Sequence, residues 1–144
     1  MEGTRSRRNA ARRGASVILG DSSYFVALAD RRDRWHPDAL RVKESVPQDF
    51  LVTDLVVAEA VTIVGSRRGG RPAKTLYDYF VDSCDIEFVE ERLLRDAMVH
   101  HLRYDGRLSV ADCVTLAVMG RRGVREIVSF DHDFDRVKGL RRIC

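Results

Sequence analysis

Short apolar runs alternate with longer amphipathic segments along most of this 144-residue chain. An apolar run of about four to eight residues fits a buried strand, whereas apolar positions at helical spacing predict a helix. Strands are predicted at five places, residues 16–19, 50–53, 86–89, 126–130 and 140–143. Helices are predicted at six places, residues 22–33, 37–46, 54–68, 71–83, 90–104 and 108–123. A short helix or turn is expected over residues 131–137.

Strands that alternate with helices predict an α/β domain with a mainly parallel sheet, covered by helices on both faces. A length of 144 residues suits one domain with one core. Apolar residues at 44% and charged residues at 33% describe a soluble globular protein. No apolar run approaches the roughly 20 residues of a membrane-spanning helix, so no membrane role is expected. In such sheets the usable site lies beyond the carboxyl ends of the strands.

The N-terminal segment is strongly basic. Residues 1–15 carry five arginines and one glutamate with almost no apolar side chains, so we expect a disordered arm followed by a folded domain over 16–144. The net charge of +3 therefore becomes −1 for the folded part, which is close to neutral. The arm either helps to hold phosphates or is a plain solvated extension. The apolar stretch after it is too short for a secretory signal.

The cysteines indicate a reducing compartment. Cys84, Cys113 and Cys144 are odd in number, widely spaced and without the C-x-x-C pair of a zinc or redox site. We therefore expect a cytoplasmic protein in which Cys113 is a small core residue.

Two acids come directly after predicted strands. Asp21 follows the first strand, and Asp131 follows "EIVSF". Because the carboxyl ends of parallel strands share one edge of the sheet, both acids should lie at that edge. The alternative for each is a helix cap, since an aspartate accepts hydrogen bonds from free amides at the start of a helix.

Two further acids lie inside apolar helical segments. Glu59 is the only charge in "LVVAEAVTIV", and Asp112 is the only charge in "LSVADCVTLAVM". We expect both helices to be largely buried, and a buried carboxylate must be paired, protonated or bound to a cation. A capping box with Ser109 is the alternative for Asp112. Glu59 lies well inside its helix, so capping does not explain it. Four acids in such positions together predict a single pocket.

Carboxylates held together repel one another unless a cation compensates. Oxygen ligands favour Mg²⁺ or Mn²⁺ over zinc, and the histidines lack the H-E-x-x-H spacing of a zinc hydrolase. We expect all four histidines, His36, His100, His101 and His132, at the surface, with only His132 near a substrate. An acidic pocket with Mg²⁺ suits phosphodiester hydrolysis. Basic groups at its mouth, either phosphate ligands or solvated loop residues, are Arg67, Arg68, Arg71 and Arg107.

Four segments carry these features in order: "VILGDSSYFVALADRRDRWHPDA", "LVTDLVVAEAVTIVGSR", "LSVADCVTLAVM" and "IVSFDHDFDRVKGLRRI". They resemble the signature segments of PIN-domain ribonucleases, particularly the VapC-like toxins of toxin–antitoxin pairs, and the resemblance covers residues 16–143. It implies a PIN-like three-layer domain with a five-stranded parallel sheet between helices. It also implies an Mg²⁺-dependent endoribonuclease with an RNA substrate, a small antitoxin partner and a homodimer.

The resemblance assigns roles residue by residue. The family's catalytic and metal-binding acids match Asp21, Glu59, Asp112 and Asp131, with Asp133 as a fifth acid at a position where members vary. The hydroxyls that support the family's site match Ser22 or Ser23, and Ser129. Two departures from the commonest form are Gly20 before the first acid and the basic arm. Neither affects the acids.

Other enzyme classes fit less well. A haloacid-type phosphatase needs a second acid two residues after the first, where this chain has Ser23. A response-regulator receiver needs a lysine late in the fold, and Lys138 stands in a turn. The alternative that remains is a PIN-fold protein that processes or binds RNA without an antitoxin.

Overall fold

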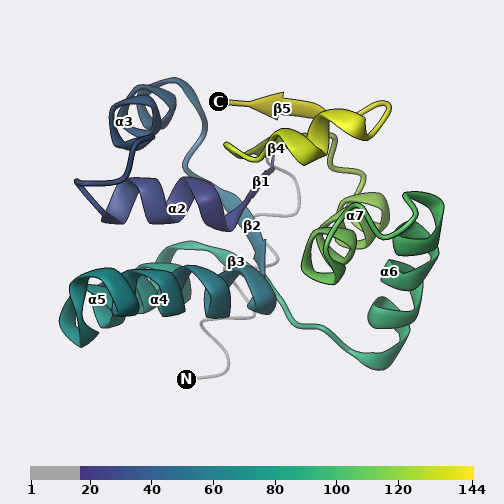
Figure 1. Ribbon diagram of the computed structural model, residues 1–144, viewed down its shortest axis with the longest axis horizontal. Coiled ribbons are helices and arrows are strands. Elements are labelled where there is room, and N and C mark those ends of the chain that lie inside the picture. Colours follow the sequence, from purple (N-terminus) through teal and green to yellow (C-terminus); the bar gives the residue numbers. More distant parts are fainter. Residues whose placement is uncertain (1–16) are drawn as a thin grey trace.

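The computed structural model describes residues 17–144, and the basic arm predicted over residues 1–15 lies outside them (Figure 1). Five strands form one sheet in the order β3-β2-β1-β4-β5, and every pairing is parallel. The strands are β1 (Ile18–Gly20), β2 (Phe50–Thr53), β3 (Asp85–Glu87), β4 (Glu126–Val128) and β5 (Arg141–Ile143). This confirms the predicted α/β class and its five-stranded parallel sheet.

Helices cover both faces of the sheet, which gives the three layers expected (Figure 1). One face carries α2 (Ser22–Ala29), α3 (His36–Ser45), α4 (Asp54–Arg68) and α5 (Gly70–Ser83). The other face carries α6 (Glu91–Arg103) and α7 (Val110–Arg122), and a 3-10 helix, η1 (His132–Arg136), precedes β5. None of the helices within residues 17–144 is long and apolar enough to cross a membrane.

Successive strand residues point to opposite faces and build two cores. Ile18 of β1 and Val128 of β4 pack under α2 to α5, whereas their neighbours Leu19 and Ile127 pack against α6 and α7. The second core also contains Cys113, which is fully buried as predicted. Burial on both faces explains why the strands read as continuous apolar runs.

The prediction that α4 is largely buried is wrong. Its buried residues form one line at four-residue spacing, Val56, Ala60 and Val64, while Ala58 and Glu59 are exposed. An outer-layer helix contacts the core along one face only, so an apolar composition does not bury the whole helix. The corresponding prediction for α7 is confirmed, because seven consecutive residues from Cys113 to Met119 are buried.

Helix α2 ends at Ala29, four residues earlier than residue 33 where the predicted helix ended. Asp30 accepts a hydrogen bond from the amide of Arg32 at 3.0 Å, which turns the chain out of the helix. The same carboxylate accepts from the guanidinium of Arg68 at 2.7 Å. This early end creates the loop over residues 30–35 that leads into α3.

Three of the four histidines are less exposed than expected. His36, His100 and His101 are half-buried, and only His132 is exposed. His36 Nδ1 donates to the carbonyl oxygen of Ala27 at 2.6 Å, and His101 Nδ1 donates to that of Leu108 at 2.9 Å. These two side chains therefore satisfy local backbone acceptors.

Gly20, which directly precedes Asp21 in the sequence, packs against a cluster of buried aromatic rings. The Phe25 ring packs between those of Phe50 and Phe80, with centroid separations of 5.4 and 4.8 Å. A Cβ atom on Gly20 would lie 2.4 Å from Phe25 Cζ and 3.1 Å from Phe50 Cδ1. The glycine therefore gives Phe25 the space that it occupies, which explains the departure from the commonest sequence form.

We expect Gly20→Ala to lower the free energy of unfolding by about 1–3 kcal/mol, because the buried Phe25 ring has no space to retreat into. Urea unfolding curves measure the change. Gly120→Ala in α7 is the matched control, since an added Cβ there meets no atom within 4 Å. The control should be neutral or stabilising by up to about 1 kcal/mol. Equal stability of the two variants would contradict the packing argument.

Candidate active site

The central strand of the sheet, β1, lies beside β4, and the chain continues from these two strands in opposite directions across the sheet. At such a switch point a doubly wound sheet opens a crevice beyond its carboxyl edge. Asp21 follows β1 and Asp131 follows β4, and the Asp21 amide donates to the carbonyl oxygen of Val128 at 3.0 Å. The two acids therefore share the edge of the sheet that the sequence predicted.

A cavity of about 610 Å³ opens at this edge. Its lining includes every acid singled out from the sequence, together with two of the serines: Asp21, Ser22, Ser23, Glu59, Asp112, Asp131 and Asp133. The third serine, Ser129, is buried and hydrogen-bonded to Asp21. The fold thus brings together acids from α4, α7 and the ends of two strands, as the single-pocket hypothesis requires.

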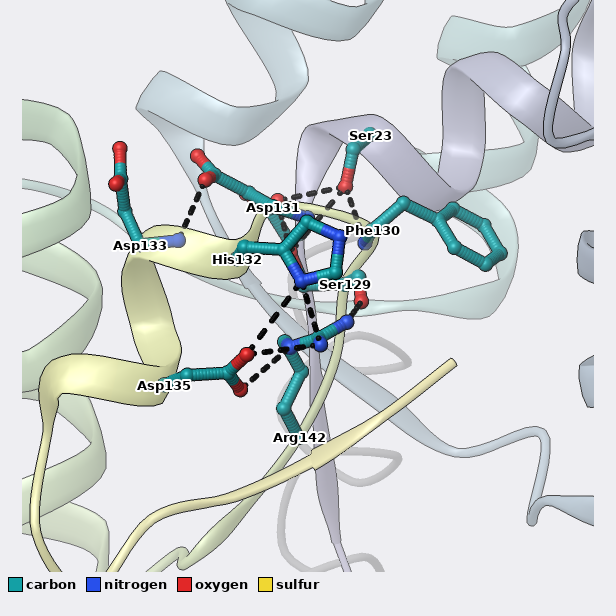
Figure 2. A network of polar contacts seen from close by, with 9 residues as sticks. Ser23, Ser129, Phe130, Asp131, His132, Asp133, Asp135 and Arg142 are labelled. Atoms are coloured by element: carbon teal, nitrogen blue, oxygen red, sulfur yellow. Dashed lines mark hydrogen bonds and ion pairs between the residues drawn. The ribbon is translucent and has the colours of Figure 1, made fainter.

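Two hydroxyl groups hold the buried carboxylate of Asp21. Ser23 Oγ and Ser129 Oγ donate to Asp21 Oδ2 at 2.8 and 2.6 Å. The same hydroxyls accept backbone amides from the chain after β4: Ser23 Oγ accepts from Phe130 at 2.9 Å, and Ser129 Oγ from Asp131 at 3.0 Å (Figure 2). Asp21 makes no side-chain cap bond to α2, so the helix-cap alternative is wrong for this residue.

Glu59 lies on the exposed face of α4 and lines the cavity. Its Oε2 accepts a hydrogen bond from Ser22 Oγ at 3.0 Å. No ion pair forms between Glu59 and a cationic side chain of residues 17–144. The carboxylate is therefore placed in the cavity without a basic partner from the described part of the chain.

The cap alternatives for the other two acids are partly true. Asp131 Oδ1 accepts the amide of Asp133 at 2.9 Å and so caps η1. Ser109 Oγ accepts the amide of Asp112 at 3.0 Å and so caps α7. Both aspartates nevertheless line the cavity. Capping and a place in the pocket are compatible.

The acids influence one another electrostatically. Burial and then the negative charge of Asp21 raise the pKa of Asp112 to about 7, with smaller contributions from Asp131 and Glu59. Burial also raises the pKa of Asp21, against the hydrogen bonds that it accepts. A carboxyl with a pKa near neutrality among three other acids is typical of a site that receives a cation.

The donor set fits a hydrated magnesium ion. Every acidic side chain at the cavity offers carboxylate oxygens, the ligands that hard divalent cations prefer. No three His, Cys, Asp or Glu side chains of residues 17–144 are close enough together to form a preformed metal-binding site. Mg²⁺ keeps several of its waters and is usually bound through one or two carboxylates, so acids spread around a roomy cavity suit it.

Arg142 was not singled out from the sequence, yet it holds the loop that carries Asp131. From β5, its guanidinium donates to both carboxylate oxygens of Asp135 at 2.8 and 3.0 Å and to the carbonyl oxygen of Ser129 at 3.1 Å (Figure 2). The exposed His132 ring lies 3.1 Å from the same guanidinium and does not line the cavity. Nothing in the local sequence around Arg142 signals this contact.

The four predicted basic residues do not all lie at the cavity. Arg67 and Arg107 line the cavity, and Arg68 lies beside it in a neighbouring cleft. Arg67 is paired with Asp33 at 2.9 Å, whereas Arg71 lines neither hollow. Of the predicted set, Arg107 is the one at the cavity with no carboxylate partner among residues 17–144.

Comparison with known proteins identifies relatives over most of the chain. The family model described as "PIN domain" matches residues 18–140. The chain is 30% identical over 138 residues to the VapC ribonuclease Mb1869c of Mycobacterium bovis, covering 89% of this chain and 100% of that protein. It is 29% identical over 120 residues to the 23S rRNA-specific endonuclease VapC20 of Mycobacterium tuberculosis, covering 82% and 92%.

Solved structures with the same fold include a toxin and a toxin–antitoxin complex. The crystal structure of Mycobacterium tuberculosis VapC20, described as a sarcin-ricin loop cleaving toxin, matches with a TM-score of 0.77 and 28% identity over 83% of this chain and 93% of that chain. A toxin–antitoxin complex from Klebsiella pneumoniae matches with a TM-score of 0.67 over 88% and 96%, at 14% identity. The second likeness shows the fold alone.

We expect the metal-free protein to lose stability as pH rises from about 4 to about 7. In that window folded Asp112 binds a proton that the unfolded chain has released, because its pKa lies near 7 instead of 3.8. Asp112→Asn should flatten the profile, and it leaves the backbone amide that Ser109 accepts in place. Urea unfolding in EDTA across this range measures both slopes. Parallel slopes for the two proteins would show that Asp112 does not have a raised pKa.

Proposed function

The chain belongs to the PIN-domain family, and we propose that it is a metal-dependent endoribonuclease of the VapC type that hydrolyses phosphodiester bonds in RNA. The observation that carries the proposal is the convergence of four acids, from two strand ends and two helices, on one cavity. Burial, together with the negative charge of Asp21, raises the pKa of Asp112 to about 7. The relatives named as ribonucleases support the same reaction class.

We assign the metal to the acids of this cavity, Asp21, Glu59, Asp112 and Asp131, with Asp133 as a fifth. One or two of these carboxylates would bind the ion directly, and the others would accept hydrogen bonds from its waters. When bound, Mg²⁺ neutralises phosphate charge and lowers the pKa of a coordinated water. The serines prevent the carboxylates from turning away: Ser23 and Ser129 fix Oδ2 of Asp21, and Ser22 fixes Oε2 of Glu59. Arg107 is placed to meet the phosphate of the RNA chain at the rim.

The first test is RNA cleavage by the full chain in Mg²⁺, its loss in EDTA, and its loss in Glu59→Gln. We expect a decrease of at least about 100-fold in rate for this variant, because it removes a metal-binding charge and keeps the volume. Glu44→Gln, an exposed acid on α3 away from the cavity, is the matched control and should cut RNA at the wild-type rate.

Stability separates this role from a structural one. Since Glu59 is exposed and is hydrogen-bonded by Ser22, Glu59→Gln should change the free energy of unfolding by no more than about 0.5 kcal/mol. Unfolding curves in EDTA accompany the cleavage assay. A folded Glu59→Gln protein that cleaves RNA normally would remove Glu59 from the active site.

We further propose that the chain is the toxin of a toxin–antitoxin pair, acts in the cytoplasm and forms homodimers. Two matched structures of low identity are a toxin–antitoxin complex and VapBC2 of Rickettsia felis bound to promoter DNA. The competing function is RNA processing or RNA binding without an antitoxin. The acidic cavity favours an inhibitory partner, because a guanidinium satisfies two carboxylates at once.

If the chain is a toxin, we expect a small protein to co-purify from the native host and to insert an arginine among Asp21, Asp112 and Asp131. Replacing that arginine by alanine in the partner should restore RNA cleavage by the complex, whereas a surface arginine of the partner should not matter. Growth arrest on expression of the nuclease alone is the companion measurement. A protein that purifies without a partner and leaves growth unaffected indicates the processing function instead.

A further inference from the structure

A second hollow of about 660 Å³ adjoins the acidic cavity. Three residues, Asp33, Trp35 and Arg67, line both hollows, so the two are continuous. We call the second one the arginine cleft, and its lining consists of Asp30, Arg32, Asp33, Arg34, Trp35, Arg67 and Arg68. Four arginines against two aspartates give it a net charge of +2 beside a pocket lined by acids.

Two of the four arginines in the cleft have no carboxylate partner among residues 17–144, and both lie on the loop over residues 30–35. Arg67 is paired with Asp33 at 2.9 Å, and Arg68 with Asp30 at 2.7 Å. No carboxylate of residues 17–144 pairs with the side chains of Arg32 or Arg34, and both residues are exposed. These two arginines are therefore available to a ligand, whereas the other two help to shape the cleft.

An aromatic platform joins the cleft to the catalytic loop. Trp35 is stacked on Phe130 with an interplanar angle of 2° and a centroid distance of 5.2 Å. Phe130 directly precedes Asp131, and its ring points away from the carboxylates of Asp131 and Asp133 (Figure 2). The Trp35 amide donates to Asp33 Oδ1 at 2.9 Å, which fixes the loop. The platform is thus positioned relative to the acids before any ligand binds.

The guanidinium of Arg34 lies over the indole ring of Trp35. The Arg34 guanidinium carbon lies 4.5 Å from the centroid of a Trp35 ring. Arginine planes and aromatic rings are the side chains on which unpaired nucleic-acid bases stack. Bases inside a duplex are not available for this contact. The cleft therefore combines a stacking surface with cations for the phosphates on either side.

From this arrangement, and resting on the proposed ribonuclease function, we infer that the arginine cleft binds an unpaired nucleotide next to the cleaved phosphate. The base stacks on the unit formed by Arg34 and Trp35, and Arg32 holds an adjacent phosphate. Arg34 and Trp35 thereby favour single-stranded or looped RNA over duplex RNA. They are substrate-positioning residues and take no part in bond breaking.

Trp35 is the only tryptophan in the chain, so its fluorescence reports directly on this cleft. We would titrate the full-length Glu59→Gln protein, in Mg²⁺, with short oligoadenylate, with an abasic ribose-phosphate chain of equal length and with duplex RNA. Quenching by oligoadenylate, with little from the abasic chain or the duplex, is expected. Unchanged fluorescence when oligoadenylate binding is saturated would overturn the inference. Stronger quenching by oligoglutamate would also overturn it, in favour of an acidic protein partner.

Arg34→Ala tests the stacking residue without disturbing the core, because the Arg34 side chain is exposed. We expect it to weaken oligoadenylate binding by about tenfold and to raise KM for single-stranded RNA while kcat changes little. Arg31→Ala removes the same charge from the same loop outside the cleft, and its effect should stay within about twofold. Arg34→Lys should resemble Arg34→Ala if planar stacking is what counts. Equal effects of Arg31→Ala and Arg34→Ala would refute the cleft.

The two hypotheses fail in different ways. Absence of Mg²⁺-dependent RNA cleavage by the wild-type chain refutes the proposed function, whatever the fluorescence does. Normal cleavage together with an unaffected Arg34→Ala variant refutes the cleft alone.

Discussion

The fold and its site depend on one buried carboxylate and the two hydroxyl groups that hold it. Asp21 lies between Ser23 at the start of α2 and Ser129 at the end of β4, and both hydroxyls donate to the same oxygen. Those hydroxyls in turn accept the amides of the loop that carries Asp131. The Asp21 carboxylate, which is costly to bury, thus connects the ends of the neighbouring strands β1 and β4 through hydrogen bonds.

The position of Asp21 also brings its charge close to the other acids of the cavity, which repel it. The acids that face Asp21 come from a helix on each side of the sheet and from the next strand end. Burial and then the charge of Asp21 raise the pKa of Asp112 to about 7. Under the proposed function, a bound cation or the guanidinium of a partner would relieve the repulsion among these acids, so catalysis and inhibition would compete for one site.

Charge is separated across neighbouring hollows. Acids line the cavity at the sheet edge, while arginines and Trp35 line the cleft that continues from it. Asp30 and Asp33 neutralise the arginines that come from α4 and leave those of the loop exposed. Such a division suits a polyanionic chain that must bring one phosphate to a metal while its neighbours are held by cations.

The sequence by itself determined the element order, the parallel sheet and the acids, because short apolar runs and residues at strand ends are local signals. It misplaced Glu59 as buried, since composition does not show which face of α4 meets the core. Only the tertiary structure joined Trp35 to Phe130 and Arg142 to the Ser129 loop. These contacts form where the sheet order places distant segments together, and that proximity is a property of the packed layers and not of any local pattern.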